Sequence, residues 1–266
     1  MSFNKNYRLE KIVFSFMLQC LFATGSVIDM RLHRFYVSQP LGEEVVIADV
    51  SLVKQWSKVF RYKKGDFVVL FNGEGHDVTY CIDTLSANSS VLVKTKSSPS
   101  YIPHKKLTLY LSVIKKDNFE LVVQKATELG VTSIVPIISE RSEKKNLSDE
   151  RLQKIAVEAS EQCGRGDIPT ISPIVTLLEA LKNIDPKDVT FVLQMGGVSL
   201  QAARTQQKNE KISAISLFIG PEGGWSEKEE NLFKERGLAS VSLGTTVLRA
   251  ETAAIVGCVY MLQDGN

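Results

Sequence analysis

The residues best suited to chemistry lie in two glycine-containing segments of the C-terminal third. The first is Ile219-Gly220-Pro221-Glu222-Gly223-Gly224-Trp225, and the second runs from Leu243-Gly244 to Leu248-Arg249-Ala250-Glu251-Thr252-Ala253. Glycine adopts backbone conformations that other residues avoid and lets the main chain approach a ligand closely. Carboxylate and guanidinium groups in such loops can take a proton or hold developing negative charge. These segments therefore predict a small-molecule site.

Regular elements are predicted on both sides of these loops. Ile215–Ile219 is an apolar run of the right length for one buried strand, and Ala239–Leu243 predicts a second short strand. Ser226 followed by Glu229 forms a capping-box pair, which predicts a helix just past the first loop. The apolar run Ala253–Leu262 predicts a helix after the second. Two glycine loops at strand ends are typical of a ligand site in an α/β sheet, although ordinary turns share this spacing.

Several common kinds of site are excluded. No Gly-Lys-Ser/Thr follows the first loop, and its glycines lack the dinucleotide-binding spacing. The four cysteines form no C-x-x-C pair, and the three histidines form no H-E-x-x-H motif, so we expect no metal. The chain also lacks the G-x-S-x-G nucleophile motif of α/β-hydrolases. Scattered cysteines indicate a reducing, cytoplasmic setting.

Composition and charge are those of an ordinary globular protein. The chain is 44% hydrophobic and 23% charged, and its 266 residues suffice for one large or two modest domains. The net charge is only +2, but residues 31–106 hold 11 lysines and arginines against 7 acidic residues, whereas residues 107–266 hold 18 against 21. A mildly basic front half fits RNA contact, although chance variation gives such differences too.

Residues 1–29 predict an extension rather than part of a domain. Lys5, Arg8 and Lys11 precede an apolar run from Ile12 to Ala23, which resembles a short secretory signal. The run is too short to span a membrane. The stretch from Met30 to Val37 is typical of a natural amino terminus. We therefore expect residues 1–29 to be poorly ordered or a short apolar helix, with no membrane partner.

Residues 30–97 predict a small β-barrel-like domain. Short β-branched and aromatic runs predict strands at Arg34–Val37, Val45–Ala48, Phe67–Phe71, Val78–Ile82 and Val91–Val93. An amphipathic helix fits Ser51–Phe60. Residues 98–104 predict a linker, because a run of serines and prolines does not continue a strand easily.

Basic and aromatic residues interleave in this front domain. Arg31, His33 and Arg34 lie near its start, and Arg61 and Lys63 follow its helix. Such mixtures suit phosphate contact and base stacking, so we expect these five residues to bind RNA. A solvated rim without function would have the same composition.

Residues 105–266 predict a second domain in which strands and helices alternate. Strands are expected at Leu107–Val113, Ser133–Ile138 and Val189–Met195 besides the two described above, and helices at Asp117–Leu129, Leu147–Gln162 and Thr176–Ile184. Asp117 is expected to cap the first of these helices. Such alternation implies a mostly parallel sheet with helices on both faces.

Six segments together resemble a known family. IGPEGGWSEKE and LGTTVLRAETA closely resemble the signature of the SPOUT class of RNA methyltransferases, and within it the RsmE family of 16S rRNA uridine-N3 methyltransferases. KATELG within Ile114–Val131, SERSEKK at Ser139–Lys145 and the segment Ala156–Ile171 match further family motifs. WSKVFRYKKGD resembles part of a PUA-like RNA-binding domain. The resemblance extends in order from Met30 to Leu262.

The resemblance implies a fold and a cofactor. The fold would be a SPOUT-type knotted α/β domain with a C-terminal trefoil knot, preceded by a PUA-like β-barrel domain, acting as a homodimer. S-adenosyl-L-methionine would be held by three loops, Gln194–Gly197, Ile219–Gly224 and Leu243–Ala253. The cofactor-binding residues would be Gln194, Gly196, Ile219, Gly220, Pro221, Glu222, Gly223, Gly224, Leu243, Gly244, Val247, Leu248, Arg249, Thr252 and Ala253.

The resemblance also implies a reaction, methylation of N3 of a specific uridine in the RNA of an assembled or partly assembled small ribosomal subunit. Uridine N3 must lose its proton, so a base or a cation that stabilises the anion would help. Arg249 is the expected charge-holding group, and Glu222 and Glu251 are the candidate bases, although either could simply anchor a loop.

The same resemblance leads us to expect that Arg141 and Arg165 touch RNA or the facing subunit. Two alternatives remain open: a SPOUT methyltransferase acting on another RNA such as tRNA, and an RNA-binding module without catalysis.

Overall fold

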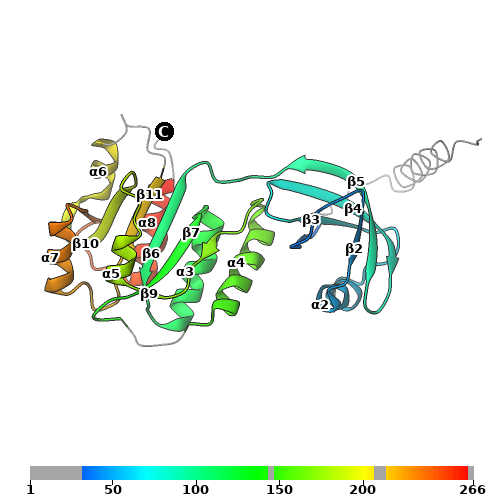
Figure 1. Ribbon diagram of the computed structural model, residues 1–266, viewed down its shortest axis with the longest axis horizontal. Coiled ribbons are helices and arrows are strands. Elements are labelled where there is room, and N and C mark those ends of the chain that lie inside the picture. Colours follow the sequence, from blue (N-terminus) through cyan, green and yellow to red (C-terminus); the bar gives the residue numbers. More distant parts are fainter. Residues whose placement is uncertain (1–31, 143–146, 207–213, 263–266) are drawn as a thin grey trace, which may run out of the picture. The chain divides into compact units, whose positions relative to one another are not determined.

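The computed structural model describes residues 32–142, 147–206 and 214–262 (Figure 1). The expected extension at residues 1–29 and the predicted RNA ligand Arg31 lie outside these ranges. None of the helices within them is long and apolar enough to cross a membrane.

The front part contains a five-stranded sheet in the order β1-β3-β4-β5-β2. Its strands are β1 (Arg34–Tyr36), β2 (Glu44–Ile47), β3 (Phe67–Phe71), β4 (His76–Leu85) and β5 (Ser90–Pro99). β1 pairs with β3 in parallel, and the other neighbours are antiparallel. All five predicted strands are confirmed. Their inward side chains form one core with Val53 and Trp56 of the helical segment.

β5 is longer than predicted, so the linker starts later than residue 98. Ser98 pairs with Asp77, and Pro99 pairs with His76. Proline has no backbone N–H to donate, and the next residue supplies the donor at this end of the strand. Ser100 N then donates to Gly75 O at 2.9 Å and ends the ladder.

The predicted helix at 51–60 is two helical segments. α2 (Val50–Lys54) is capped by Asp49, whose carboxylate accepts from Ser51 N and Leu52 N. The bond from the Ser51 hydroxyl and these backbone bonds lower the pKa of Asp49. The wider π-helical segment η1 (Gln55–Phe60) follows, and Arg61 ends it in the left-handed conformation, with φ of 58°.

The back part contains a parallel sheet in the order β12-β10-β11-β6-β7-β8, with β9 also paired to β7. The strands are β6 (Lys106–Ser112), β7 (Ser133–Ile138), β8 (Thr170–Ile171), β9 (Val175–Thr176), β10 (Val189–Ser199), β11 (Ala214–Ile219) and β12 (Ala239–Ser242). The helices are α3 (Lys116–Leu129), α4 (Asp149–Cys163), α5 (Leu177–Lys182), α6 (Leu200–Gln206), α7 (Glu227–Glu235) and α8 (Ala250–Leu262). The predicted parallel sheet is confirmed; β8, β9 and α6 were not predicted.

Helices cover both faces of this sheet, as predicted (Figure 1). Leu107, Leu109 and Leu111 of β6 point to one face, where they pack in a core with residues of α3, α4, α6 and α8. Tyr110 points to the other face and packs with α5 and with Phe233 of α7. Alternation along a strand sends successive side chains to opposite faces, so one strand contributes to both cores. Helix starts differ in detail: α3 begins at Lys116, so Asp117 lies in its first turn and is not its cap.

Arg34 is part of a buried junction and is not available to RNA, contrary to our expectation. Its Nε and Nη2 donate to both carboxylate oxygens of Asp77, at 2.8 and 2.7 Å. Its Nη1 donates to Ser160 O at 2.8 Å, at the end of α4, and its side chain is only 12% exposed. Carbonyls at a helix C-terminus attract cations. Arg34 therefore ties β1 to α4.

Arg165 is buried too, so its expected contact with RNA or a facing subunit is wrong. Its Nε and Nη2 donate to the carboxylate of Asp167, and its Nη1 donates to Thr127 O and Val131 O at 2.8 and 2.9 Å. The residue is 1% exposed. Gly166 N donates to Tyr101 O, so this cluster also holds the chain that leaves β5.

Glu161 gives the junction a pH dependence that can be measured. Its Oε1 accepts from Tyr36 N at 2.8 Å, and burial raises the pKa of this carboxyl, opposed by the Tyr36 bond. A folded-state pKa above the unfolded value of about 4.3 means that the group supports folding below that value. Its contribution is lost as the pH rises through the folded-state pKa.

Glu161→Gln keeps an acceptor for Tyr36 N and removes the buried charge. We expect a melting temperature about 1–2 °C higher than the parent at neutral pH, with the difference disappearing at acid pH. Thermal melts between pH 4 and 8 test this, with Glu74→Gln, on an exposed loop residue, as the control. A variant that is less stable at neutral pH would show that the charged carboxylate stabilises the junction.

Candidate functional site

The three expected loops meet at one edge of the large sheet. β10 lies between β11 and β12 and is parallel to both. The carboxyl ends of parallel neighbours share an edge, so the segments 194–197, 220–224 and 243–249 all leave the sheet there. Strand order thus brings together loops that are far apart in the sequence.

The first loop is an interruption within β10. Leu193 and Val198 both pair with Val241 of β12, so Gln194–Gly197 has no partner in the ladder and stands out from the strand. Gly196 has φ of 78°, and a Cβ on Gly197 would lie 2.7 Å from the backbone of Val241. Both glycines are therefore required by the backbone: one by its conformation, the other by its close approach to β12.

Gly197→Ala should push β10 and β12 apart at this point. Overpacking of this kind typically destabilises a protein by about 1–3 kcal/mol, and we expect the loop to lose ligand affinity too. Chemical unfolding and calorimetry measure the two effects. Gly42→Ala is the control, because its Cβ would meet only Glu44 O at 3.5 Å. Equal stability of the two variants would show that β12 adjusts freely.

The second loop is packed against the first through Trp225. The Trp225 indole N–H donates to Leu193 O at 3.1 Å, and the ring lies against Gly220. Gly224 N donates to Pro221 O at 2.9 Å and closes the turn. Ile219 is 1% exposed in the core, so only its main chain can face a ligand.

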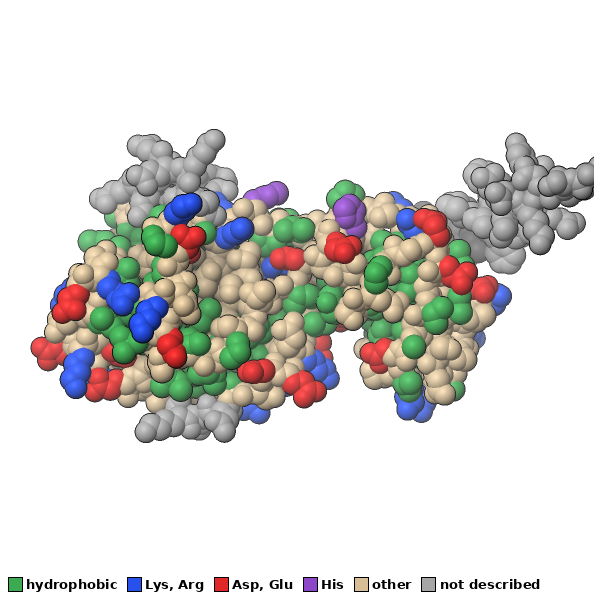
Figure 2. Space-filling model, in the orientation of Figure 1, with side chains coloured by type: hydrophobic (Ala, Val, Ile, Leu, Met, Phe, Trp, Pro, Cys, Tyr) green, Lys and Arg blue, Asp and Glu red, His purple; other side chains and the backbone are tan. Residues whose placement is uncertain are grey.

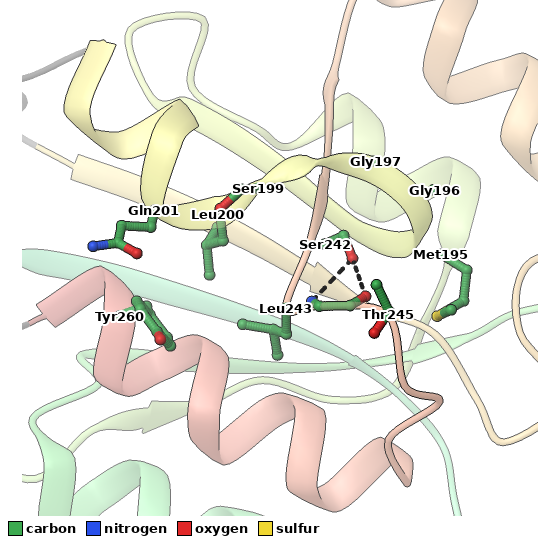
Figure 3. Close-up of a pocket in the computed structure, with 11 residues that line it drawn as sticks. Met195, Gly196, Gly197, Ser199, Leu200, Gln201, Ser242, Leu243, Thr245 and Tyr260 are labelled. Atoms are coloured by element: carbon green, nitrogen blue, oxygen red, sulfur yellow. Dashed lines mark hydrogen bonds between the residues drawn. The ribbon is translucent and has the colours of Figure 1, made fainter.

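A pocket of about 580 Å³ opens between the first loop, the third loop, α6 and α8 (Figure 3). Ser242 Oγ bonds to both N and O of Gly244 and shapes the third loop. The lining residues are Met195, Gly196, Gly197, Ser199, Leu200, Gln201, Ser242, Leu243, Gly244, Thr245 and Tyr260.

Of the predicted cofactor residues, Gly196, Leu243 and Gly244 belong to this lining, and the second loop and Arg249 do not. Sequence reasoning missed Ser199, Gln201 and Tyr260. Ser199 is the last residue of β10, Gln201 lies in the unpredicted helix α6, and Tyr260 lies near the end of α8.

The candidate catalytic side chains differ in their surroundings. Glu222 is exposed, and its Oε1 accepts from Lys115 N at 3.4 Å just before α3. Glu251, in the first turn of α8, is 9% exposed, and its Oε2 has no hydrogen-bond partner among the residues that the structure describes. Arg249 precedes α8 with an exposed side chain, and its carbonyl accepts from Ala253 N at 2.8 Å. Gln194 Oε1 is a second buried acceptor without a described partner.

The remaining loop residues are divided between solvent and core. Val247 is 82% exposed, and Thr252 is exposed too. Ala253 lies in the core at 8% exposure, and Leu248 is half-buried against it. Of the other predicted RNA ligands, Arg141 is exposed, and its Nη1 donates to Gly223 O and Trp225 O.

The front domain presents an aromatic and basic cluster at the end of η1. His33 Nδ1 and the Tyr62 hydroxyl are 2.7 Å apart, and the Phe60 ring lies 4.2 Å from the His33 ring and stacks on Tyr62. Burial, and then the nearby Asp66, raise the pKa of Tyr62. Arg61 and Lys63 are exposed beside these rings.

The face of the molecule in Figure 2 is not strongly basic. On the face in Figure 2, lysine and arginine side chains are interspersed with acidic and hydrophobic ones. Within the described ranges, no three histidine, cysteine or acidic side chains gather closely enough to hold a metal ion.

The segment that forms the α/β sheet and its loops matches a known class of domain. The family model described as RNA methyltransferase domain matches residues 102–262, which is most of the back part of the chain. The match includes the three loops and the pocket.

Similarity to individual proteins shows to which family of RNA methyltransferases the chain belongs. Ribosomal RNA small subunit methyltransferase E of Rickettsia conorii is 32% identical over 243 residues, covering 89% of this chain and 98% of that protein. The chain belongs to the family of ribosomal RNA small subunit methyltransferase E.

Solved structures agree. The enzyme of the same name from Neisseria gonorrhoeae, solved bound to S-adenosyl methionine, has a TM-score of 0.78 at 29% identity, covering 87% of this chain and 97% of its own. A Legionella pneumophila protein described as a methyltransferase, in complex with the same cofactor, has a TM-score of 0.76 at 27% identity, covering 88% and 98%.

Proposed function

We propose that this protein methylates N3 of a specific uridine in small-subunit (16S) ribosomal RNA, with S-adenosyl-L-methionine as methyl donor and an assembled or partly assembled subunit as substrate. The meeting of three glycine-containing loops at one edge of the sheet, in a chain of this family, carries the proposal. The names of its relatives support ribosomal RNA over tRNA. A ribosomal RNA substrate also supports a cytoplasmic location for this protein.

The residues present fit the cofactor. A pocket of about 580 Å³ is in the range of small-molecule sites. Gly196 and Gly244 have positive φ, which exposes main-chain groups that can recognise a neutral adenine. Gln194 does not line the pocket, but its Oε1 in the first loop is a buried acceptor without a described partner, and it suits an amino or hydroxyl donor of a ligand held by that loop. Leu243 supplies apolar surface for the ring.

When bound, the cofactor supplies an electrophilic methyl group to uridine N3, which gives up its proton as the new bond forms. This chain's part is to place the uridine and to control its charge. Arg249 is exposed at the end of the third loop and can hold negative charge on the base. Glu222 already accepts from Lys115 N, so we assign it an anchoring role. Glu251, whose Oε2 has no partner among the described residues, is the better candidate base.

The front domain is proposed to grip RNA as a PUA-like module. The rings of His33, Phe60 and Tyr62 can stack on bases, and Arg61 and Lys63 can contact phosphates. Arg61 holds a left-handed backbone conformation, which is uncommon for a residue with a side chain and is often associated with function.

A trefoil knot and a homodimer complete the proposal. α8 follows the edge strand β12 but packs against α3, β6 and β11, so the chain crosses the carboxyl end of the sheet after β12. Such a crossing is what a knot requires. Met195, Val198, Val247 and Tyr260 are large apolar residues that are exposed near the loops, and a second copy of the chain would cover them.

Two measurements test the proposal. Calorimetry with S-adenosylmethionine should show one site per chain, and no binding would leave only an RNA-binding module. Mapping of N3-methyluridine in ribosomal RNA and tRNA, from cells with and without the gene, should show one position in small-subunit RNA that depends on it. Loss of a tRNA modification instead would establish the alternative substrate.

A further inference from the structure

A turn at the end of β7 is fixed by its own hydroxyl groups. Ser139 N donates to Ser142 Oγ at 3.0 Å, and the two hydroxyls lie 2.7 Å apart. Ser139 Oγ also donates to Ser112 Oγ at the end of β6. The turn is thus held to the sheet edge that carries the three loops. It presents one long cationic side chain, Arg141.

A buried carboxylate joins this turn to the second loop. Glu229 is 8% exposed, and its Oε1 accepts from Glu140 N at 2.8 Å. Its Oε2 accepts from Ser226 N, also at 2.8 Å, at the start of α7. The Glu229 carboxylate therefore holds the backbone just before Arg141 and the backbone just after Trp225.

The Arg141 guanidinium completes the second loop from outside. Its Nη1 donates to Gly223 O at 2.9 Å and to Trp225 O at 3.2 Å. Its stem packs on Gly223, where an added Cβ would lie 3.3 Å from Arg141 Cβ. The carbonyls of Gly223 and Trp225 thus accept from the same guanidinium nitrogen.

These bonds hold two peptide groups of the loop, each at both its carbonyl and its N–H. In the peptide between Gly223 and Gly224, the carbonyl accepts from Arg141 and the N–H donates to Pro221 O. In the peptide between Trp225 and Ser226, the carbonyl accepts from Arg141 and the N–H donates to Glu229. A peptide held at its carbonyl and its N–H cannot rotate without losing a bond. Arg141 therefore preorganises the loop.

Trp225 also connects the second loop to the first loop. The Trp225 indole N–H donates to Leu193 O, immediately before Gln194–Gly197. A shift of Trp225 would move the point at which β10 leaves its ladder.

We propose that Arg141 is a positioning residue of the cofactor site: it holds the Gly223–Trp225 turn and, through Trp225, the start of the first loop. The proposal rests on the proposed use of S-adenosylmethionine and replaces RNA contact as the main role of Arg141. Charge-assisted bonds to two carbonyls are strong enough for their loss to weaken cofactor binding about 10–100-fold.

The test compares Arg141→Ala, Arg141→Lys and the control Arg151→Ala, which removes an exposed arginine paired with Glu120. Calorimetry gives Kd for S-adenosylmethionine, filter binding gives Kd for RNA without cofactor, and steady-state kinetics separate KM from kcat. We expect Arg141→Ala to raise the cofactor Kd and KM, with RNA affinity unchanged. Lysine should restore part of the loss because it keeps the charge without the planar fork.

A readout without cofactor separates this proposal from the proposed function. The chain has two tryptophans, and the indole N–H of Trp225 should exchange with solvent about tenfold faster in Arg141→Ala, while that of buried Trp56 stays unchanged. If the parent binds no cofactor, the proposed function fails, but the exchange rates still test Arg141. An unchanged Trp225 rate, or weaker RNA binding at unchanged cofactor Kd, would overturn the assignment.

Discussion

Arg165→Ala should destabilise the folded protein by about 3–5 kcal/mol, the typical effect of removing one partner from a buried ion pair. The substitution leaves the Asp167 carboxylate without its arginine and removes the bonds from Nη1 to Thr127 O and Val131 O, although Thr127 O keeps its bond from Gly130 N. Thr127 O lies in the last turn of α3, so the end of that helix loses its connection to the chain that leaves α4. Urea unfolding, followed by far-UV circular dichroism, measures the loss.

Two further variants show whether the loss comes from this cluster. Arg165→Lys keeps the charge but not the fork that reaches Asp167 with two nitrogens, so we expect an intermediate loss. Arg165→Ala combined with Asp167→Asn should recover part of the stability, because the second change removes the unpaired charge. A stable Arg165→Ala protein with weakened RNA binding would instead restore the RNA role expected from the sequence.

Local signals predicted the elements around the site well. The capping box at Ser226 and Glu229 has both of its bonds, and α7 begins at the next residue. Glycines 130 and 164 end α3 and α4 in the left-handed conformation, where glycine is favoured. The strand predicted at Leu107–Val113 is β6, and its side chains pack on both faces of the sheet. Each of these features depends on a few neighbouring residues.

Features that depend on distant partners were missed. The interruption of β10 at Gln194–Gly197 exists because Leu193 and Val198 both pair with Val241, more than forty residues away. Nothing local to residues 189–199 indicates that pairing. The end of α2 widens into η1 without a proline or glycine to mark the change.

Basic side chains were the hardest to place. The residues next to Arg34 and Arg165 in the sequence are those expected around an exposed cation. Both guanidinium groups nevertheless donate to carbonyls and carboxylates within the fold. Arg61 and Lys63 have similar surroundings and are exposed. Residue type and spacing alone do not separate these cases, because burial of an arginine depends on which main-chain acceptors the fold brings to it.

Arg249→Ala should lower kcat about 10²–10³-fold, the usual effect of removing one group that stabilises charge in a transition state. The fold should survive, because the Arg249 carbonyl keeps its bond from Ala253 N when the exposed side chain is truncated. Single-turnover methylation of RNA measures the rate, and calorimetry checks that the cofactor Kd is little changed.

The pH dependence and two comparisons define the role of Arg249. If this arginine stabilises the uridine anion, a rising pH should partly restore the variant's rate, because more uridine is already deprotonated. Arg249→Lys should keep part of the rate because it keeps a positive charge. Glu222→Gln, which retains an acceptor for Lys115 N, should change the rate less than tenfold if Glu222 only anchors the loop. An unchanged rate in Arg249→Ala would remove the residue from the mechanism, whereas a higher cofactor Kd at unchanged kcat would make it a cofactor ligand.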